Sequence, residues 1–407
     1  MKIIHTSDWH LGAKLHEQDR GEDHRAFLAF LATLIAEEKP DALVVSGDVF
    51  DTRQPTPAAQ KLYYDFLAEV ARGGNCGKVV VTAGNHDSSS MLAAADGVLR
   101  RLQVEVVSRA GDDPAGEVCR VDGADGLPAL VIAAVPFMGD GELANFARAA
   151  GSTAEVPTER LAAGFAAHYA AVFAEAKRVA GNAPVVVTGH CTVSGARVSD
   201  ERSERGRQIG GLGAREGAAF GDADYVALGH LHIPQFVGEG ERVRYSGSPL
   251  AMSFAEAGCA KSVTVVEFAG AAGGGIAVRE VPVPDFTPLR VFEGGTEGVR
   301  HAVTALVAAK PALVYAAVRI TEGEGELAPF WSELDSVVQG SGVRILLKEN
   351  ARPHAQPGSG LAAASEKTLS AMTPLEVATL RINEESDLTE EERSTYVSMV
   401  EKVIGEL

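Results

Sequence analysis

Five short motifs in the first 232 residues carry side chains that could bind metal ions. Each follows an apolar run that is typical of a buried strand, and their sequences are Asp8-Trp9-His10, Gly47-Asp48-Val49-Phe50-Asp51, Gly84-Asn85-His86-Asp87, Gly189-His190 and Gly229-His230-Leu231-His232. The carboxyl ends of neighbouring parallel strands meet at one edge of a sheet, where ligands bind. We therefore expect these loops, which are far apart in the sequence, to form one site.

The donor atoms in the motifs are carboxylate oxygens, an amide oxygen and imidazole nitrogens, without a thiolate. Such a set favours a hard or borderline divalent ion, such as Mn²⁺, Fe²⁺ or Zn²⁺, over a structural zinc site. Seven donors are too many for one such ion, but they suffice for two ions that share a carboxylate and act on a phosphate ester. We expect Asp48 to be the shared ligand. The candidate ligands are Asp8, His10, Asp48, Asn85, His190, His230 and His232.

His86 follows the candidate ligand Asn85, so we expect its side chain to face the substrate rather than the ions. It is a natural general acid for the leaving oxygen, and Asp51 is placed to orient it. The sequence has no serine elbow and no catalytic-cysteine motif, so attack by activated water is favoured over a covalent intermediate. We interpret the remaining histidines as ordinary core or surface residues: His5, His16, His24, His168, His301 and His354.

The segments between the motifs alternate between strand and helix patterns. Apolar residues recur at helical spacing in three of them, over residues 25–37, 61–70 and 159–179. Strands are predicted over residues 104–107, 130–135 and 262–268, besides those that precede the motifs. This alternation predicts an α/β fold.

The composition changes after residue 285. Strand and helix patterns alternate between residues 289 and 349, which indicates a small separate α/β unit. Residues 350–364 are rich in Ala, Gly and Pro, as in linkers. Thr389 and Glu392 form a capping box before a charged helix with an apolar stripe that ends at Leu407. We therefore divide the chain into residues 1–285, 286–350, a linker at 351–364 and a helical segment at 365–407.

The charge balance limits how this protein could bind nucleic acid. The net charge is -18, whereas a protein that binds nucleic acid unaided is usually basic. A nucleic-acid substrate would need local positive charge, bound metal or a partner protein. Four arginines lie between Arg197 and Arg207, but three acidic residues nearly cancel them, so both a solvated loop and a phosphate-contacting loop remain open.

Other features bear on the compartment and on nucleotide hydrolysis. The four cysteines are scattered without a Cys-x-x-Cys pair, and neither a signal-peptide pattern nor a membrane-spanning run is present, so we expect a cytoplasmic protein. The segment from Arg72 to Val79 lacks the first glycine and the Ser/Thr of a phosphate-binding loop. We do not expect this chain to hydrolyse ATP.

The five motifs resemble those of the calcineurin-like metallophosphoesterases, which read D-x-H, G-D-x-x-D, G-N-H-[DE], G-H and G-H-x-H. The segment Tyr245–Phe254 and the residues around the first, second and fifth motifs are more closely similar to the bacterial break-repair nucleases of that superfamily. The resemblance implies a β-sandwich flanked by helices. It also implies a small α/β capping domain at 286–350 that guides DNA, and a C-terminal segment that docks on the coiled-coil base of an ATPase subunit.

The same resemblance implies how the site residues are divided. Asp8, His10, Asp48 and His232 would hold one Mn²⁺ ion, and Asp48, Asn85, His190 and His230 would hold the other. His86 would be the catalytic histidine. The implied activity is hydrolysis of DNA phosphodiesters, as an exonuclease on duplex ends and an endonuclease on single strands and hairpins, by a homodimer within a heterotetramer.

Two alternatives stay open at this point. The first is a phosphodiesterase for small phosphoesters on the same fold, which would need neither the cap nor the C-terminal apolar stripe. The second is a metal-binding scaffold subunit of the ATPase, which could lose His86 and the ligands without losing its role. The intact set of site residues favours the nuclease.

Overall fold

The computed structural model describes residues 1–197, 217–238, 240–323 and 325–351, together with five residues near the end of the chain. Contacts divide the chain into two compact units, Met1–Ala351 and Arg352–Leu407, and all predicted site residues belong to the first. The predicted linker and helical segment, with the exception of Ala351, Arg393, Tyr396, Val397, Met399 and Val400, lie outside the described residues. So does most of the arginine-rich segment after Arg197.

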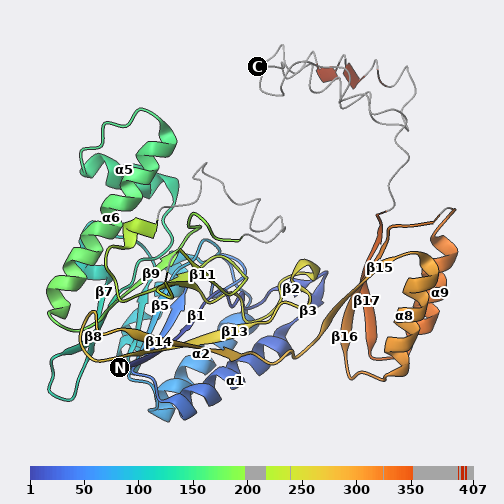
Figure 1. The fold of residues 1–407 in the computed structure, drawn as a ribbon, viewed down its shortest axis with the longest axis horizontal. Helices are drawn as coiled ribbons and strands as arrows, with labels where there is room; N and C mark the ends of the chain where they lie inside the picture. Colours follow the sequence, from blue (N-terminus) through green and yellow to red (C-terminus); the bar gives the residue numbers. More distant parts are fainter. Residues whose placement is uncertain are drawn as a thin grey trace. The chain divides into compact units, whose positions relative to one another are not determined.

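The first of two six-stranded sheets carries three of the five motifs (Figure 1). β1, β4, β5 and β6 run parallel, β13 pairs antiparallel with β1, and β14 pairs antiparallel with β13. In order across the sheet, its strands are β14 (Ile276–Pro282), β13 (Ser262–Phe268), β1 (Lys2–Thr6), β4 (Ala42–Ser46), β5 (Lys78–Thr82) and β6 (Val104–Val107).

The second sheet carries the other two motifs. Its central strands β8, β9, β10 and β12 are parallel, and β7 and β11 lie antiparallel at the two edges. In order, its strands are β11 (Gln235–Val237), β12 (Val243–Tyr245), β10 (Tyr225–Gly229), β9 (Val185–His190), β8 (Pro128–Ala133) and β7 (Val118–Asp122).

The two sheets pack face to face, and helices cover their outer faces (Figure 1). Apolar residues of both sheets, among them Val44 and Val186, form one buried cluster between them. The alternate residues of the first sheet pack on α1 (Gly21–Glu38) and α2 (Pro57–Gly73), and those of the second on α5 (Asp140–Ala149) and α6 (Pro157–Ala180). Both faces of the central strands are therefore buried, which explains their continuous apolar sequences.

Helix boundaries follow from local capping. α2 begins four residues before the predicted helix because Thr56 accepts a hydrogen bond from the Ala59 amide and Pro57 occupies the first turn. It ends at Gly73, and the following residue, Gly74, caps it in a left-handed conformation. The other long helices, α1 and α6, also extend the predicted spans at their ends.

Residues 289–350 form a smaller parallel sheet of β15 (Leu289–Gly294), β16 (Val314–Ile320) and β17 (Val343–Asn350). The helices α8 (Thr296–Ala308) and α9 (Ala328–Val338) pack on one face in a core of their own. A second cluster joins Leu289 and Tyr315 to Leu15 and Phe254 of the preceding chain. The remaining short elements are β2 (Lys14–Leu15), β3 (Gln18–Asp19), α3 (Ser89–Ala93), α4 (Asp96–Leu99), η1 (Arg100–Leu102), η2 (Pro114–Glu117), η3 (Gly217–Phe220) and η4 (Phe254–Glu256).

All four cysteines are free thiols. Among the described helices, none has both the length and the apolar character needed to cross a membrane.

Candidate metal centre

The candidate ligands lie where strands of both sheets end. Asp8 and Asp48 each follow a parallel strand, β1 or β4, by two residues, and Asn85 follows β5 by three. In the second sheet, His190 is the last residue of β9 and His230 comes directly after β10. One edge of the sandwich therefore collects donors from loops that are more than 200 residues apart.

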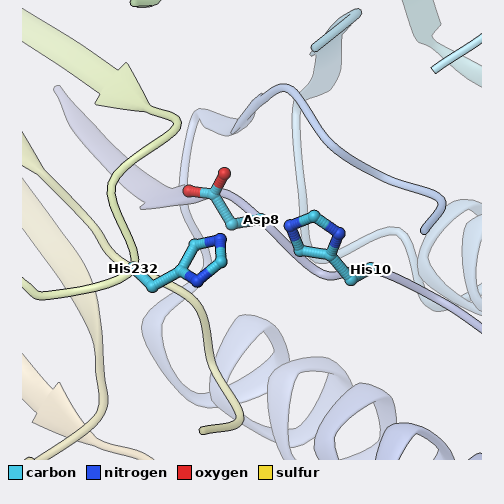
Figure 2. Close-up of side chains that lie close together, drawn as sticks. All are labelled: Asp8, His10 and His232. Atoms are coloured by element: carbon cyan, nitrogen blue, oxygen red, sulfur yellow. The ribbon is translucent and has the colours of Figure 1, made fainter. Parts of the chain in front are cut away.

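A first group of donors consists of Asp8, His10 and His232, whose ligand atoms lie within 4.8 Å of one another (Figure 2). His10 Nε2 is also 3.6 Å from Asp48 Oδ2. His10 is only 2% exposed, yet neither of its ring nitrogens makes a hydrogen bond. Buried polar atoms are almost always paired, so this imidazole fits a metal ligand well.

A second group surrounds the amide oxygen of Asn85. This Oδ1 atom lies 3.0 Å from His190 Nε2 and 3.1 Å from His230 Nδ1. His190 Nε2 is in turn 3.2 Å from Asp48 Oδ2. One amide oxygen, one carboxylate oxygen and two imidazoles therefore converge, which is a donor set for a borderline divalent ion.

Asp48 is common to both groups. Its Oδ1 atom accepts a hydrogen bond of 2.8 Å from the His86 amide, which fixes the carboxylate. Its Oδ2 atom faces His190 on one side and His10 on the other. The geometry thus has one carboxylate oxygen between the histidines of the two groups.

The electrostatics of the site reflect burial and dense charge. Burial raises the pKa of Asp8 and would raise that of Asp48, but the charge of His190 holds the Asp48 pKa well below its usual value. Burial lowers the pKa of His190, whereas Asp48 more than compensates and raises it to about 9. Burial lowers the pKa of His230 to about 3, so this ring is neutral at physiological pH. Neutral imidazoles and ionised carboxylates are the forms that bind metal, so an ion held by His190 would displace the proton from that ring.

Four candidate ligands have a left-handed backbone. The φ angles are 52° at Asp8, 45° at His10, 50° at Asp48 and 98° at His230. Such conformations cost non-glycine residues on the order of 1–3 kcal/mol each, and they persist where the surroundings enforce them. The strain is therefore concentrated at the metal-binding loops.

Hydrogen bonds hold these loops in place. The Asp8 carboxylate accepts from the Ser7 hydroxyl at 2.6 Å and from the His230 amide at 2.9 Å, which ties the first sheet to the second. Asp87 is buried, and its carboxylate accepts from the amides of Val49, Phe50 and Gly84. Side chains next to the ligands thus satisfy the backbone of the strained turns.

Two motif glycines allow the loops to approach closely. A Cβ atom at Gly84 would overlap the carboxylate and the amide nitrogen of Asp48. A Cβ atom at Gly229 would overlap the main-chain carbonyl of Ser46 in the other sheet. Any side chain at either position would push the ligand loops apart.

His86 lies beside the two groups without belonging to either tetrad predicted for the ions. Its Nδ1 atom is 2.7 Å from the main-chain carbonyl of Asp51, which can only accept, so Nδ1–H donates. Its ring stacks edge-on against His10, with centroids 4.7 Å apart. Asp51 thus orients His86 through its backbone, whereas its carboxylate lies 3.4 Å from His10 Nδ1.

Comparisons with known proteins identify the family of this chain. Residues 1–234 match the calcineurin-like phosphoesterase family. The D subunit of the nuclease SbcCD from Escherichia coli K12 is 33% identical over 402 residues, which cover 98% of this chain and 96% of the relative. The Rhodobacter capsulatus protein of the same name is 34% identical over 91% of this chain and 93% of the relative. That of Bacillus subtilis is 34% identical over 66% of each chain.

This chain belongs to the SbcD family of calcineurin-like phosphoesterases. Membership confirms the predicted fold class, a helix-flanked metallophosphoesterase sandwich, and the predicted activity, that of a metal-dependent nuclease. It also implies divalent metal ions, and the structure has groups of donors that could hold them.

A cavity of about 180 Å³ opens onto the donors of this SbcD-type site. Besides Asp48, Asp51, Asn85 and four histidines (His10, His86, His230 and His232), it is lined by Ala13, Lys14 and Met252. Lys14 and Met252 were not among the predicted site residues. Met252 belongs to the segment Tyr245–Phe254, whose similarity to the SbcD family was the available signal, whereas nothing in the local sequence distinguishes Lys14 from other surface lysines.

Proposed function

We propose that this chain is the nuclease subunit of an SbcCD-type complex. It would degrade duplex DNA from the ends and cut single strands and hairpins, with two Mn²⁺ ions at the sandwich edge. The convergence of the two donor groups on Asp48 carries this proposal. Two ions that share a carboxylate are the usual means by which proteins hydrolyse phosphodiesters at neutral pH.

The donors divide naturally between the two ions. Asp8, His10 and His232 would hold one ion together with Asp48, and Asn85, His190 and His230 would hold the other together with the same carboxylate. When bound, the ions would polarise the phosphate oxygens and lower the pKa of a water molecule. Oxygen and imidazole donors without thiolate favour Mn²⁺ over a structural zinc ion.

His86 would protonate the leaving oxygen of the DNA strand. Its Nδ1–H group is committed to the Asp51 carbonyl, so Nε2 is the nitrogen that can deliver a proton. The ring must then be in the imidazolium form before transfer, and the backbone contact keeps its orientation unchanged during transfer. Asp51 would serve as the residue that positions His86.

The remaining parts of the chain would serve substrate and partner binding. We propose that residues 286–350 form a capping domain that guides DNA, since residues 289–350 have their own sheet and core. Residues 365–407 would dock on an SbcC-type ATPase after a linker at 351–364, in a heterotetramer with two nuclease subunits. The free thiols support a cytoplasmic location. SbcC would contribute much of the DNA affinity, because the net charge of this chain is -18.

Cleavage of a hairpin-ended DNA in Mn²⁺ by wild type and His86→Leu tests the catalytic part of the proposal. The metal content of each protein is measured in parallel. We expect His86→Leu to retain two ions and to lose cleavage by a factor of about 10²–10⁴.

The other outcomes separate the alternatives. Equal cleavage by wild type and His86→Leu would remove His86 from the mechanism. A wild type that hydrolyses small phosphodiesters but no DNA would favour the small-molecule enzyme. An inactive wild type supplied with SbcC and ATP would favour the scaffold. Tight binding of duplex DNA by the isolated chain at physiological salt would contradict the role given to SbcC.

A further inference from the structure

A buried glutamate outside the seven predicted ligands contacts one of them. Glu256 Oε1 lies 3.2 Å from His232 Nδ1, and Glu256 and His232 are 1% and 5% exposed. The second carboxylate oxygen of Glu256 is paired with Lys261 Nζ. Lys261 also donates to the His232 carbonyl at 2.9 Å and to the Ser248 hydroxyl at 3.0 Å. The buried charges of Glu256 and Lys261 therefore offset one another.

This contact determines the state of the His232 ring. A carboxylate paired with an ammonium group is ionised, and an ionised carboxylate only accepts hydrogen bonds. His232 Nδ1 must then carry the proton, which leaves the lone pair on Nε2. That nitrogen is the donor that His232 would offer to the group with Asp8 and His10.

The turn that carries Glu256 is itself held firmly. Ser253 caps η4 by accepting a hydrogen bond from the Ala255 amide. Phe254, in the same turn, is 4% exposed and packs in a cluster with Leu289 and Tyr315. Since both sides of η4 are fixed, the carboxylate of Glu256 has little freedom to follow a moving imidazole.

The other candidate histidine ligands have different partners. His190 Nδ1 lies 3.0 Å from the main-chain carbonyl of Ser46, which is a neutral acceptor. His10 Nδ1 lies 3.4 Å from the Asp51 carboxylate, but neither ring nitrogen of His10 makes a hydrogen bond. A carboxylate partner fixes the orientation of a ligand imidazole and makes it a stronger donor than a carbonyl partner does. Of these three rings, His232 is the one whose Nδ1 atom has a hydrogen bond with a carboxylate.

We infer that Glu256, anchored by Lys261, is a positioning residue that fixes the tautomer of His232 and strengthens it as a metal ligand. The inference rests on the proposed two-ion site. It predicts that Glu256 controls the affinity for the ion held by Asp8, His10 and His232, and affects the other ion much less. Its role is exerted through His232 and involves no contact with DNA.

Calorimetric titration of the metal-free full-length chain with Mn²⁺ tests the inference. The variants are Glu256→Gln and the double variant Glu256→Gln/Lys261→Met, which leaves no buried charge without a partner. Glu117→Gln is the matched control, because Glu117 forms another buried pair with a histidine, His168, at 3.0 Å. Absorption spectra of the Co²⁺-loaded proteins report the ligand field at each site.

We expect both Glu256 variants to bind one of two Mn²⁺ ions 10–100-fold more weakly and to show a changed Co²⁺ spectrum. Glu117→Gln should bind both ions as the wild type does, even if its melting temperature falls. Unchanged affinities and spectra in folded Glu256 variants would overturn the inference while the proposed function stands. Equal weakening of both ions would contradict the assignment to His232. A wild type that binds no Mn²⁺ would overturn the proposed function and this inference together.

Discussion

Strand β1 and the loop after it place two buried histidines five residues apart, in different surroundings. His5 lies within the strand between the two sheets, where its Nδ1 is 3.0 Å from the Tyr225 hydroxyl. His10 lies in the loop with a φ of 45°, close to the carboxylates of Asp48 and Asp51. Both residues are nearly inaccessible to solvent. Burial therefore does not distinguish a metal ligand from a core histidine.

Charge does distinguish the two regions. Burial, assisted by the nearby Arg244, lowers the pKa of His5 to about 3, so the interior of the sandwich holds a neutral ring. The edge instead gathers Asp8 and Asp48, whose charges would repel one another without a cation between them. The strained backbone occurs at the same edge. Neighbouring carboxylates and a strained loop backbone therefore distinguish the candidate ligand His10 from the core histidine His5.

Replacing the shared carboxylate should have the largest effect on this contrast. In Asp48→Asn the negative charge between His10 and His190 is lost, so both ions should bind weakly. The electrostatic difference between the edge and the neutral interior should shrink. We expect hairpin cleavage to fall by about 10³-fold or more, since metal ions supply several kcal/mol of transition-state stabilisation. Metal analysis and cleavage assays measure the two effects. Retention of two tightly bound ions would show that Asp48 is not shared.

A methyl group at Gly84 should distort the metal-binding loops and leave the packing between the two sheets unchanged. In Gly84→Ala the added Cβ overlaps Asp48, so the loop must move. We expect a loss of about 1–3 kcal/mol in the free energy of unfolding together with weaker metal binding. Gly97→Ala is the control, because a Cβ atom there meets nothing within 4 Å. Normal metal affinity in Gly84→Ala would mean that the loop can shift while the ligands stay in place.

The buried histidine between the two sheets, His5, should make the stability of the protein depend on pH below 6.5. The folded-state pKa of His5 is about 3 and its ordinary value is 6.5, so between these values the unfolded chain binds a proton that the folded chain does not. Stability therefore falls as the pH is lowered through this window, by up to about 1.4 kcal/mol per pH unit. His5→Gln should remove this contribution. Denaturant unfolding of both proteins between pH 6.5 and 5 measures the difference, and equal slopes would contradict the burial argument.

The sequence predicts the residues of this site that follow directly from a strand, and it does not predict contacts that depend on how separate loops pack. The ligands could be predicted because each follows an apolar strand, and strand ends of parallel sheets meet. The contacts of Lys14, Met252 and Glu256 could not be predicted from the sequence, because they depend on how separate loops pack against one another. The contact of Asp51 with His86 depends on the loop conformation, which turns the carbonyl of Asp51 rather than its carboxylate toward the ring. The apolar pattern predicts a helix that begins at residue 61, whereas α2 begins at Pro57 because Thr56 caps it.

The smallest predicted effect concerns Lys14, which lines the cavity next to the metal-binding edge. Unlike the candidate ligands and the interior of the sandwich, this residue is exposed to solvent. Lys14 lines the cavity with a side chain that is 55% exposed and 3.2 Å from Glu17. Because solvent screens exposed charges, its attraction for a DNA phosphate is worth about 1 kcal/mol or less. Lys14→Ala should therefore raise KM up to about fivefold at low salt, leave kcat unchanged and lose its effect in high salt.

Lys61→Ala provides the comparison, because Lys61 is an exposed lysine on α2 with an acidic partner, Asp65, at 2.6 Å. It removes the same charge from the chain but lies outside the residues that line the cavity. If both variants raised KM equally, the effect would come from the overall charge of the protein. A drop in kcat with Lys14→Ala alone would instead place this lysine among the groups that contact the reacting phosphate.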